Sequence, residues 1–308
     1  MRAGTQTFGG YEIDVSSVDK VLFPDSGITK GALLDHYDRV AEVALPYLRN
    51  RPVALKRCPD GIDDCFFQKA ASDHFPDWIA RVAVPLRGED RQTTHVVVDD
   101  HPTLVYLADQ GTVELHPWLS PADDLEHPDQ AIFDLDPPGG DPGSVDAARF
   151  AARKVRDLLA DLGLPSLVKT SGSKGYHVHV VLDGTAPYDE VRDFTASVSA
   201  VLADRYPDRL TTAKRKDQRN GRVFLDYLRN AYGQHAVAPY SVRALDGAPV
   251  ATPLDWDELG DADPQRYTVH NLFRRLGQKD DPWAEAWGSG GALDDARDRL
   301  EELLDDGA

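Results

Sequence analysis

The stretch Ala131–Pro138, with the sequence AIFDLDPP, decides which fold the rest of the chain can form. An apolar run leads into Asp-x-Asp, and two prolines end the segment. In a strand, residues i and i+2 share a face, so Asp134 and Asp136 would project together while Leu135 faces the core. Two adjacent carboxylates repel each other unless a cation lies between them, and oxygen ligands suit Mg²⁺ or Mn²⁺. Two solvated aspartates before a proline turn explain this motif alone equally well.

Composition sets the broad class of the protein. The chain has 308 residues, of which 41% are hydrophobic, so it can bury a core and form one large domain or about two smaller ones. No apolar run approaches the roughly 20 residues of a membrane span, and the N-terminus lacks the apolar core of a signal peptide. A net charge of −18 disfavours a protein that coats nucleic acid through bulk charge. A local basic channel stays open, because cations cluster at 214–216 and continue to Arg219 and Arg222.

Two cysteines, Cys58 and Cys65, are too few for a metal-ligand or disulfide framework. We therefore expect a reduced, cytoplasmic location.

Strands and a helix follow the Asp-x-Asp stretch in a regular order. The pattern predicts a helix that Ser144 caps and Gly163 ends, then strands over 166–170, 176–182 and 221–227, with a turn over 171–175 between the first two. A strand–helix–strand unit followed by a hairpin is typical of an α+β fold. On the N-terminal side, Thr29 should cap a helix, and residues 52–57 should form a strand.

Asp226 ends a second predicted strand and would be a third carboxylate. Three carboxylates on one sheet can hold two divalent ions, the arrangement that assists phosphoryl displacement. Taken alone, Asp226 is explained as well by a surface position beside Tyr227.

The turn Ser171-Gly-Ser-Lys-Gly could form an anion-binding nest of backbone N–H groups, with Ser171 and Lys174 adding donors. A plain hairpin turn is the simpler interpretation. His177 and His179 share a strand face, so they could ligate Zn²⁺, although no further ligand is spaced to complete the site. Alternatively, His177 bonds a phosphate and His179 is structural.

Other polar residues near strand ends would suit a triphosphate, with Lys as a point charge and Arg as a fork: Lys56, His116, Gln234 and Arg243. Each could equally be a solvated side chain. Phe66 and Phe67 are adjacent, so we expect at least one of them to pack in the core while an exposed one could stack on a base. Lys20 and Lys30 could grip a phosphate or be ordinary surface lysines.

Seven segments in order resemble the polymerase domain of bacterial ATP-dependent DNA ligase D, a branch of the archaeo-eukaryotic primase superfamily. They are DKVLFPDSGITK, RPVALKRCPDGID with FFQK, LHPW, FDLDPP, TSGSKGYHV, GRVFLDYLRN and APYSVRA. The resemblance as a whole runs from about Asp19 to past Arg275. The resemblance implies one primase-polymerase catalytic domain over 1–308. Its expected parts are DNA-binding elements over 1–130, an RRM-like mixed or antiparallel catalytic sheet over 131–250, and a helical segment over 251–308. Flanking helices and a second small sheet complete this α+β fold.

The resemblance also implies a function: template-directed nucleotidyl transfer in DNA repair, filling gaps and extending ends with a preference for ribonucleotides. Asp134, Asp136 and Asp226 would hold two Mn²⁺ or Mg²⁺ ions. The incoming NTP or dNTP would contact Lys56, His116, Ser171, Lys174, His177, Gln234 and Arg243. DNA would contact Lys20 and Lys30 through a 5′-phosphate, Phe66 and Phe67 at the templating base, and Arg219 and Arg222 along the template or primer. Ku and a DNA ligase acting in trans are possible partners.

Two features depart from the family pattern. His235 occupies a position where threonine is common, which weakens the assignment of Gln234. The sequence also contains no ligase or nuclease module, so it would be an excised domain or a stand-alone relative. Two other functions remain open from the residues: a metal-dependent phosphodiesterase or nuclease that uses the same aspartates, and a non-catalytic DNA-end-binding module.

Overall fold

The computed structural model describes residues 1–139 and 141–305, so Gly140 and the end of the expected segment 251–308 lie outside the described residues. The chain divides into two compact units, each described here by itself. Unit 1 comprises Met1–Asp123, His235–Thr252 and Arg266–Asp280, and unit 2 comprises Asp124–Gln234, Pro253–Gln265 and Asp281–Ala308. The expected division of the chain at residues 130 and 250 stays a prediction. None of the described helices is long and apolar enough to cross a membrane.

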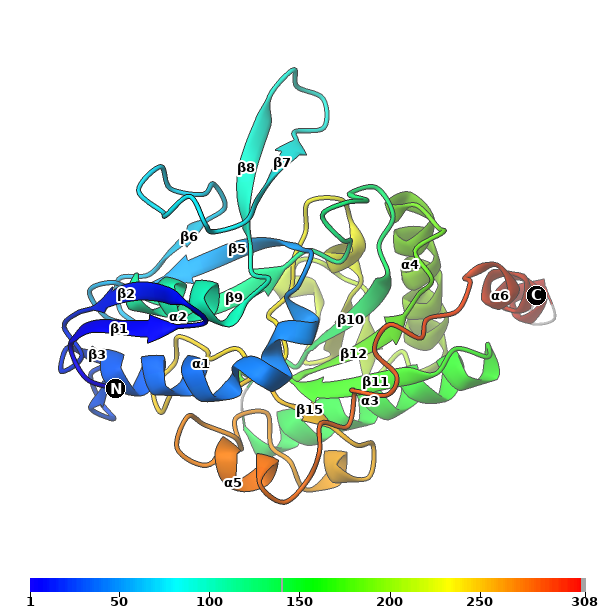
Figure 1. Ribbon diagram of the computed structural model, residues 1–308. Helices are drawn as coiled ribbons and strands as arrows, with labels where there is room; N and C mark the ends of the chain where they lie inside the picture. The colour runs from blue at the N-terminus through cyan, green and yellow to red at the C-terminus, as the bar shows by residue number, and fades with distance from the viewer. Residues whose placement is uncertain (140, 306–308) are drawn as a thin grey trace. The chain divides into compact units, whose positions relative to one another are not determined.

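Unit 1 is built on a five-stranded sheet, with two short two-stranded sheets and three α-helices in the same unit (Figure 1). Its sheet has the order β6-β5-β8-β7, and β9 pairs with β5 on the other edge. The strands of that sheet are β5 (Pro52–Arg57), β6 (Phe66–Gln68), β7 (Arg81–Pro85), β8 (Gln92–Val97) and β9 (Thr112–Pro117). The remaining elements are β1 (Gly4–Phe8), β2 (Tyr11–Val15), β3 (Val21–Phe23), β4 (Ile28–Thr29), α1 (Lys30–Ala44), α2 (His101–Asp109) and α5 (Leu272–Leu276).

Helix α1 begins where the sequence predicts. The Thr29 side chain accepts a hydrogen bond from the Ala32 N–H, which satisfies one of the unpaired donors of the first turn. The α-helix ends at Ala44, and a short 3₁₀ turn that contains Pro46 follows it. This agrees with proline being unable to continue a helix beyond its first turn.

The two cysteines form a disulfide, so the expectation that they would not is wrong. Strands β5 and β6 are antiparallel with Arg57 opposite Phe66, and one step further that register places Cys58 opposite Cys65, with their Cα atoms 4.3 Å apart. The bond therefore closes the loop that joins these strands. Cysteine count alone could not reveal this pairing, because it depends on the hairpin register.

Unit 2 is a six-stranded sheet with two long helices packed against it. The strand order is β13-β14-β10-β12-β11-β15; only β13 and β14 are parallel. Its strands are β10 (Gln130–Asp136), β11 (Ser166–Thr170), β12 (Tyr176–Val181), β13 (Leu210–Thr211), β14 (Val223–Asp226) and β15 (Pro253–Leu254). Its helices are α3 (Pro142–Asp161), α4 (Tyr188–Arg205) and α6 (Asp294–Asp305). The α+β class and the β11–β12 hairpin are confirmed.

Strand β10 lies inside this sheet, between β14 and β12. Phe133 and Leu135 are fully buried, which contributes roughly 1.5–3 kcal/mol for each side chain. Helix α3 follows and covers the sheet, but Asp141 rather than Ser144 is its N-cap, because the Asp141 carboxylate accepts the Ser144 N–H and O–H. Ser144 is instead the residue that this cap holds. Gly163 follows the last turn at φ +81°, as expected for a residue that ends a helix.

Candidate active site

The sheet of unit 2 places four ionisable residues in one row across neighbouring strands. Asp226 on β14 lies opposite Asp134 on β10, Asp134 lies opposite His177 on β12, and His177 lies opposite Lys169 on β11. Asp136 is two residues beyond Asp134 on the same strand, so it shares that face of the sheet. The sequence-predicted carboxylates are therefore neighbours. Register, which sets pairs of Cβ atoms about 5 Å apart, is what brings them together.

Basic side chains contact this row only in part. The Arg229 Nε lies 3.3 Å from Asp134 Oδ2 and 3.7 Å from Asp226 Oδ2. His177 Nε2 lies 3.4 Å from Asp134 Oδ1, and Arg219 Nη1 lies 3.7 Å from Asp136 Oδ2. Asp134 is thus contacted from both sides, whereas Asp136 has a single, longer ion pair.

The pKa values of the three aspartates diverge as a result. Burial alone would raise the pKa of Asp134, but the charge of His177, its hydrogen bond, and Arg229 hold that pKa well below its usual range. Burial and then the neighbouring Asp134 charge raise the pKa of Asp136 to about 6. The same two causes raise the pKa of Asp226. Asp136 and Asp226 therefore carry negative charge that the surrounding protein does not fully compensate.

Carboxylate oxygens with uncompensated charge are a donor set that fits a hard divalent cation. Within the described residues, no three His, Cys, Asp or Glu side chains are arranged as a complete metal site. This is compatible with Mg²⁺ chemistry, since that ion is commonly held by one or two carboxylates while water and substrate phosphates supply its other ligands. Two of the aspartates, such as the paired Asp134 and Asp226, would be enough for an ion held in this way.

The turn between β11 and β12 is fixed by Ser171 and Gly175. The Ser171 Oγ accepts the N–H groups of Ser173 and Gly175, each at 3.2 Å, so this hydroxyl binds its own turn. A Cβ on Gly175 would lie 2.0 Å from the Leu135 carbonyl oxygen, which is why only glycine lets the turn approach β10. Lys174 is exposed at the tip of this turn. The structure thus brings the turn against the aspartate strand.

The two histidines of β12 have different surroundings. His177 faces Asp134, whereas His179 Nδ1 lies 3.1 Å from Gln130 Oε1 and its ring is 4.8 Å from that of Trp283. No third metal-ligating side chain joins them among the described residues. This arrangement agrees with a structural His179 and disfavours the zinc interpretation.

The two arginines after β13 have different contacts, one mainly with backbone carbonyl groups and the other also with an aspartate. Arg222 donates to the carbonyl groups of Arg219, Pro207 and Gln218. Arg219 contacts Asp136, and its guanidinium lies 4.0 Å from the centre of the Phe224 ring.

Gln234 is exposed at the end of the first stretch of unit 2. The predicted nucleotide contact at Gln234 stays a prediction.

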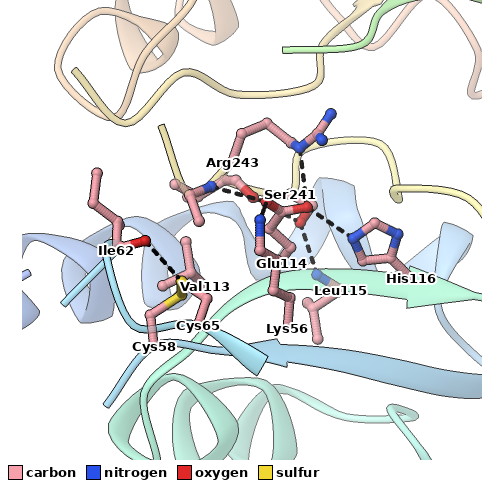
Figure 2. Close-up of polar contacts among 12 residues, drawn as sticks. Lys56, Cys58, Ile62, Cys65, Val113, Glu114, Leu115, His116, Ser241 and Arg243 are labelled. Atoms are coloured by element: carbon pink, nitrogen blue, oxygen red, sulfur yellow. Dashed lines mark hydrogen bonds and ion pairs between the residues drawn. A yellow bond between two sulfur atoms is a disulfide. The ribbon is translucent and has the colours of Figure 1, made fainter. Parts of the chain in front are cut away.

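Unit 1 gathers three of the predicted triphosphate contacts around one buried acid (Figure 2). Lys56 Nζ lies 2.8 Å from Glu114 Oε1, and His116 Nε2 lies 2.8 Å from Glu114 Oε2. Arg243 Nε lies 3.0 Å from the same Oε2. The Ala244 N–H donates to Oε1 at 3.0 Å. Glu114 is only 1% exposed, so these four donors meet at a point inside the unit.

Phe66 and Phe67 are 47% and 53% exposed, so the expectation that at least one of them packs in the core is wrong. Their strand, β6, has three residues and lies at an edge of the sheet, where neither face is covered. The Phe67 ring lies 5.2 Å from that of His116 and 5.8 Å from that of His235. An exposed aromatic surface therefore adjoins the Glu114 cluster.

Lys20 and Lys30 are neighbours with different surroundings. The Lys30 N–H donates to the Lys20 carbonyl, which fixes the two backbones side by side. Lys20 forms an exposed ion pair with Asp60 at 2.6 Å, whereas Lys30 forms a buried one with Asp109 at 2.7 Å. Only Lys20 carries its charge at the surface.

Most of the chain is similar to proteins of one family. The family model described as LigD, primase-polymerase domain, matches residues 29–283. The chain belongs to the LigD primase-polymerase domain family. This confirms the expected family and its nucleotidyltransferase enzyme class.

Curated relatives of the LigD family cover most of the chain. The multifunctional non-homologous end joining DNA repair protein LigD of Mycobacterium tuberculosis is 34% identical over 280 residues, which are 87% of this chain and 36% of that protein. LigD of Pseudomonas aeruginosa is 34% identical, over 93% of this chain and 34% of its own length. The bifunctional LigD of Bacillus subtilis is 30% identical, over 88% and 44%. The chain thus spans between about a third and less than half of these relatives.

A solved structure agrees with the LigD fold. The polymerase domain of M. tuberculosis ligase D, determined in complex with DNA, superposes with a TM-score of 0.81 at 32% identity. The match covers 89% of this chain and 97% of that one. The expected α+β primase-polymerase fold is therefore confirmed.

Sequence reasoning missed several residues of the two clusters, one in each unit. Glu114 lies two residues before His116 on a strand, so alternation could have placed both on one face. Arg229 follows Asp226 by three residues, and Lys169 precedes Ser171 by two. Neither spacing is distinctive, because the role of each residue depends on strands that pair across the sheet.

Proposed function

We propose that this chain is a template-directed nucleotidyltransferase that fills gaps and extends broken DNA ends in repair, with a preference for ribonucleotides. The observation that carries the proposal is the pairing of Asp134 with Asp226, with Asp136 on the same face, in a chain of the LigD primase-polymerase family. The ribonucleotide preference rests on the family resemblance.

Asp134, Asp136 and Asp226 would hold the two divalent ions, Mn²⁺ or Mg²⁺. When bound, such ions lower the pKa of an attacking hydroxyl and neutralise the triphosphate and its leaving pyrophosphate. The chain's own residues would contribute in two ways. His177 and Arg229 keep Asp134 ionised, and the strands place Asp136 and Asp226 on the same face of the sheet as Asp134.

The family resemblance assigns contacts of the incoming NTP or dNTP in each unit. Lys56, His116 and Arg243 in unit 1 supply positive charge beside an exposed aromatic surface. In unit 2 we assign Lys174, His177, Gln234 and the turn of Ser171 to nucleotide binding. Since the Ser171 hydroxyl binds its own turn, its role would be to shape the turn.

DNA would be held by residues that are exposed or beside the aspartates. Phe66 and Phe67 are placed to stack on bases, because their rings are open to solvent. Lys20 would hold the 5′-phosphate at a gap, with Lys30 supporting it. Arg219 and Arg222 would contact the template or primer. Ku and a ligase in trans are proposed partners, and the chromosome as substrate places the protein in the bacterial cytoplasm.

The deciding experiment is incubation of the chain with labelled NTP, Mn²⁺ and a gapped primer–template. We expect nucleotides to be added to the primer, with little addition after Asp136→Ala. Degradation without addition would instead identify a phosphodiesterase. If Asp136→Ala left every activity intact, a non-catalytic end-binding module would be the better account.

A further inference from the structure

Glu114 is the most completely bonded carboxylate of unit 1, and it touches three of the proposed triphosphate ligands at once. We infer that Glu114 is a positioning residue that holds Lys56, His116 and Arg243 as one preorganised receptor for a polyphosphate chain. This inference rests on the proposed function. It goes beyond that function because it assigns a role to Glu114, a carboxylate whose negative charge would repel the phosphates of a nucleotide.

The strands explain why these groups meet. Glu114 and His116 are i and i+2 on β9 and share a face, and Lys56 on β5 lies directly opposite Glu114. The segment from Ala238 to Ala244 is held against β9 by hydrogen bonds. The Leu115 carbonyl accepts the Ala238 N–H, and the Leu115 N–H donates to Ser241 Oγ. Arg243 and Ala244 then reach Glu114 from that segment. Figure 2 shows the side chains converging on the carboxylate.

All acceptor positions of Glu114 are in use. A carboxylate has about four lone-pair sites, and Lys56, His116, Arg243 and the Ala244 N–H supply four donors. Burial alone would raise the pKa of Glu114, but His116, Arg243 and Lys56 outweigh it and keep the acid ionised. The carboxylate is therefore fixed in place.

Lys56 keeps capacity for a second anion. Lysine has three donors, and Glu114 receives one from Lys56. Arg243 contacts Glu114 through its Nε. Lys56 and Arg243 are 25% and 19% exposed, whereas Glu114 is 1% exposed, so the acid forms the floor and the cations the rim. One acid between two permanent cations leaves net positive charge at this rim.

A purely structural role explains the cluster less well. Buried ion pairs rarely stabilise a fold more than apolar residues of the same volume do, because desolvation offsets their attraction. Fixing long, flexible cations before the ligand arrives lowers the entropy lost on binding. This benefit exists only if an anion binds at the rim.

The first test measures anion binding without catalysis. Inorganic tripolyphosphate is titrated calorimetrically into the full chain, its Glu114→Gln and Glu114→Asp variants, and the control Asp100→Ala. Glutamine keeps the size of Glu114 but turns a donor toward Arg243, so we expect binding to weaken at least about tenfold. Aspartate keeps the charge and should restore part of it. Asp100 caps α2 in the same unit, away from the Glu114 donors, so its variant should bind like the parent.

The second test uses nucleotide addition to a gapped primer–template. Glu114→Gln should raise KM for NTP at least about tenfold with kcat within about threefold, since it removes prior ordering of ligand contacts. When Glu114→Gln is combined with Arg243→Ala, it should raise KM for NTP little beyond the value of Arg243→Ala alone, because Glu114 acts partly through that arginine.

The outcomes separate the two proposals. A parent chain that binds tripolyphosphate but adds no nucleotide would overturn the proposed function and leave the inference standing. The inference alone would be overturned if the parent adds nucleotide and Glu114→Gln binds tripolyphosphate and adds nucleotide as well as the parent does. An equal loss of binding in Asp100→Ala would also overturn it, because the effect would then follow stability. If Glu114→Gln does not fold, Glu114→Asp carries the same comparison.

Discussion

The aspartate row of unit 2 and the Glu114 cluster of unit 1 are both acidic groups among bases, yet their balance of charge is opposite. Three carboxylates in unit 2 are contacted by Arg229, Arg219 and His177, and the pKa values of two of them rise. In unit 1 a single carboxylate faces Lys56, Arg243 and His116, and its pKa falls. In the first group the charge of Asp134 adds to burial in raising the pKa values of Asp136 and Asp226, whereas in the second group the surrounding bases lower the pKa of the acid.

This difference indicates which ligand each group can accept. A site with excess acid gains from a bound cation, and one with excess base gains from a bound anion. Divalent ions would meet the first need, and the phosphates of a nucleotide would meet the second. A balanced pair such as Lys30–Asp109 should gain from neither, so charge balance separates binding groups from structural ones. The predictions below test that rule.

The largest effect is expected at the aspartate row. Asp134→Asn and Asp226→Asn keep side-chain size but remove charge that the proposed ions need, so primer extension should fall at least about a thousandfold, or about 4 kcal/mol of transition-state stabilisation. Extension with Mn²⁺ measures this, and DNA binding should survive. Asp204→Ala, an exposed acid of the same unit, is the control. If Glu114→Gln lowered kcat as severely, the distinction between the two groups would be lost.

The next effect concerns the balanced pair. Lys30→Ala leaves the Asp109 carboxylate buried without its ion pair, which should lower the free energy of unfolding by about 3 kcal/mol. That corresponds to a fall in Tm of roughly 6–10 °C. Lys20→Ala removes an exposed pair and should change stability by less than about 0.5 kcal/mol, yet reduce the preference for a 5′-phosphorylated gap. If Lys30→Ala left Tm unchanged, Lys30 would have to be counted among the cations that bind ligands rather than among the structural ion pairs.

The sequence predicts these groups to different degrees. Asp134, Asp136 and Asp226 can be found because acids at strand ends follow apolar runs, and alternation places Leu135 in the core. Glu114 looks like any other strand acid until β5 and the segment before Ala244 are seen to meet it. The same holds for Cys58 and Cys65, whose pairing follows from the register of β5 and β6. Local periodicity predicts elements, whereas long-range register decides which charges become neighbours.

Phe66 and Phe67 show the same limit from the opposite direction. Aromatic residues favour burial, and a strand normally turns one of two neighbours inward. Here the strand is a short edge strand, so both rings stay exposed. Only the position of a strand within its sheet tells whether an inward face exists.

The smallest expected effect tests whether the aspartate row is really short of positive charge. In the folded protein the pKa of Asp136 rises from 3.8 to about 6, so ionising it opposes folding. The penalty is a small fraction of its full value near pH 4, increases as the pH rises toward 6, and is complete above about pH 7. Its full value would be about 3 kcal/mol, which we reduce to about 1 kcal/mol because the side chain is 49% exposed and screened by solvent.

Asp136→Asn removes this penalty, so with chelator present it should be about 1 kcal/mol more stable than the parent at pH 7.5 and equally stable at pH 4. Denaturant unfolding at the two pH values measures the difference. Mn²⁺ should then stabilise the parent more than the variant. In the parent a bound cation relieves the repulsion between the carboxylates, and in the variant the uncharged asparagine has removed part of that repulsion. A variant less stable than the parent at pH 7.5 would mean that the surrounding arginines already compensate the row, and its contrast with the Glu114 cluster would disappear.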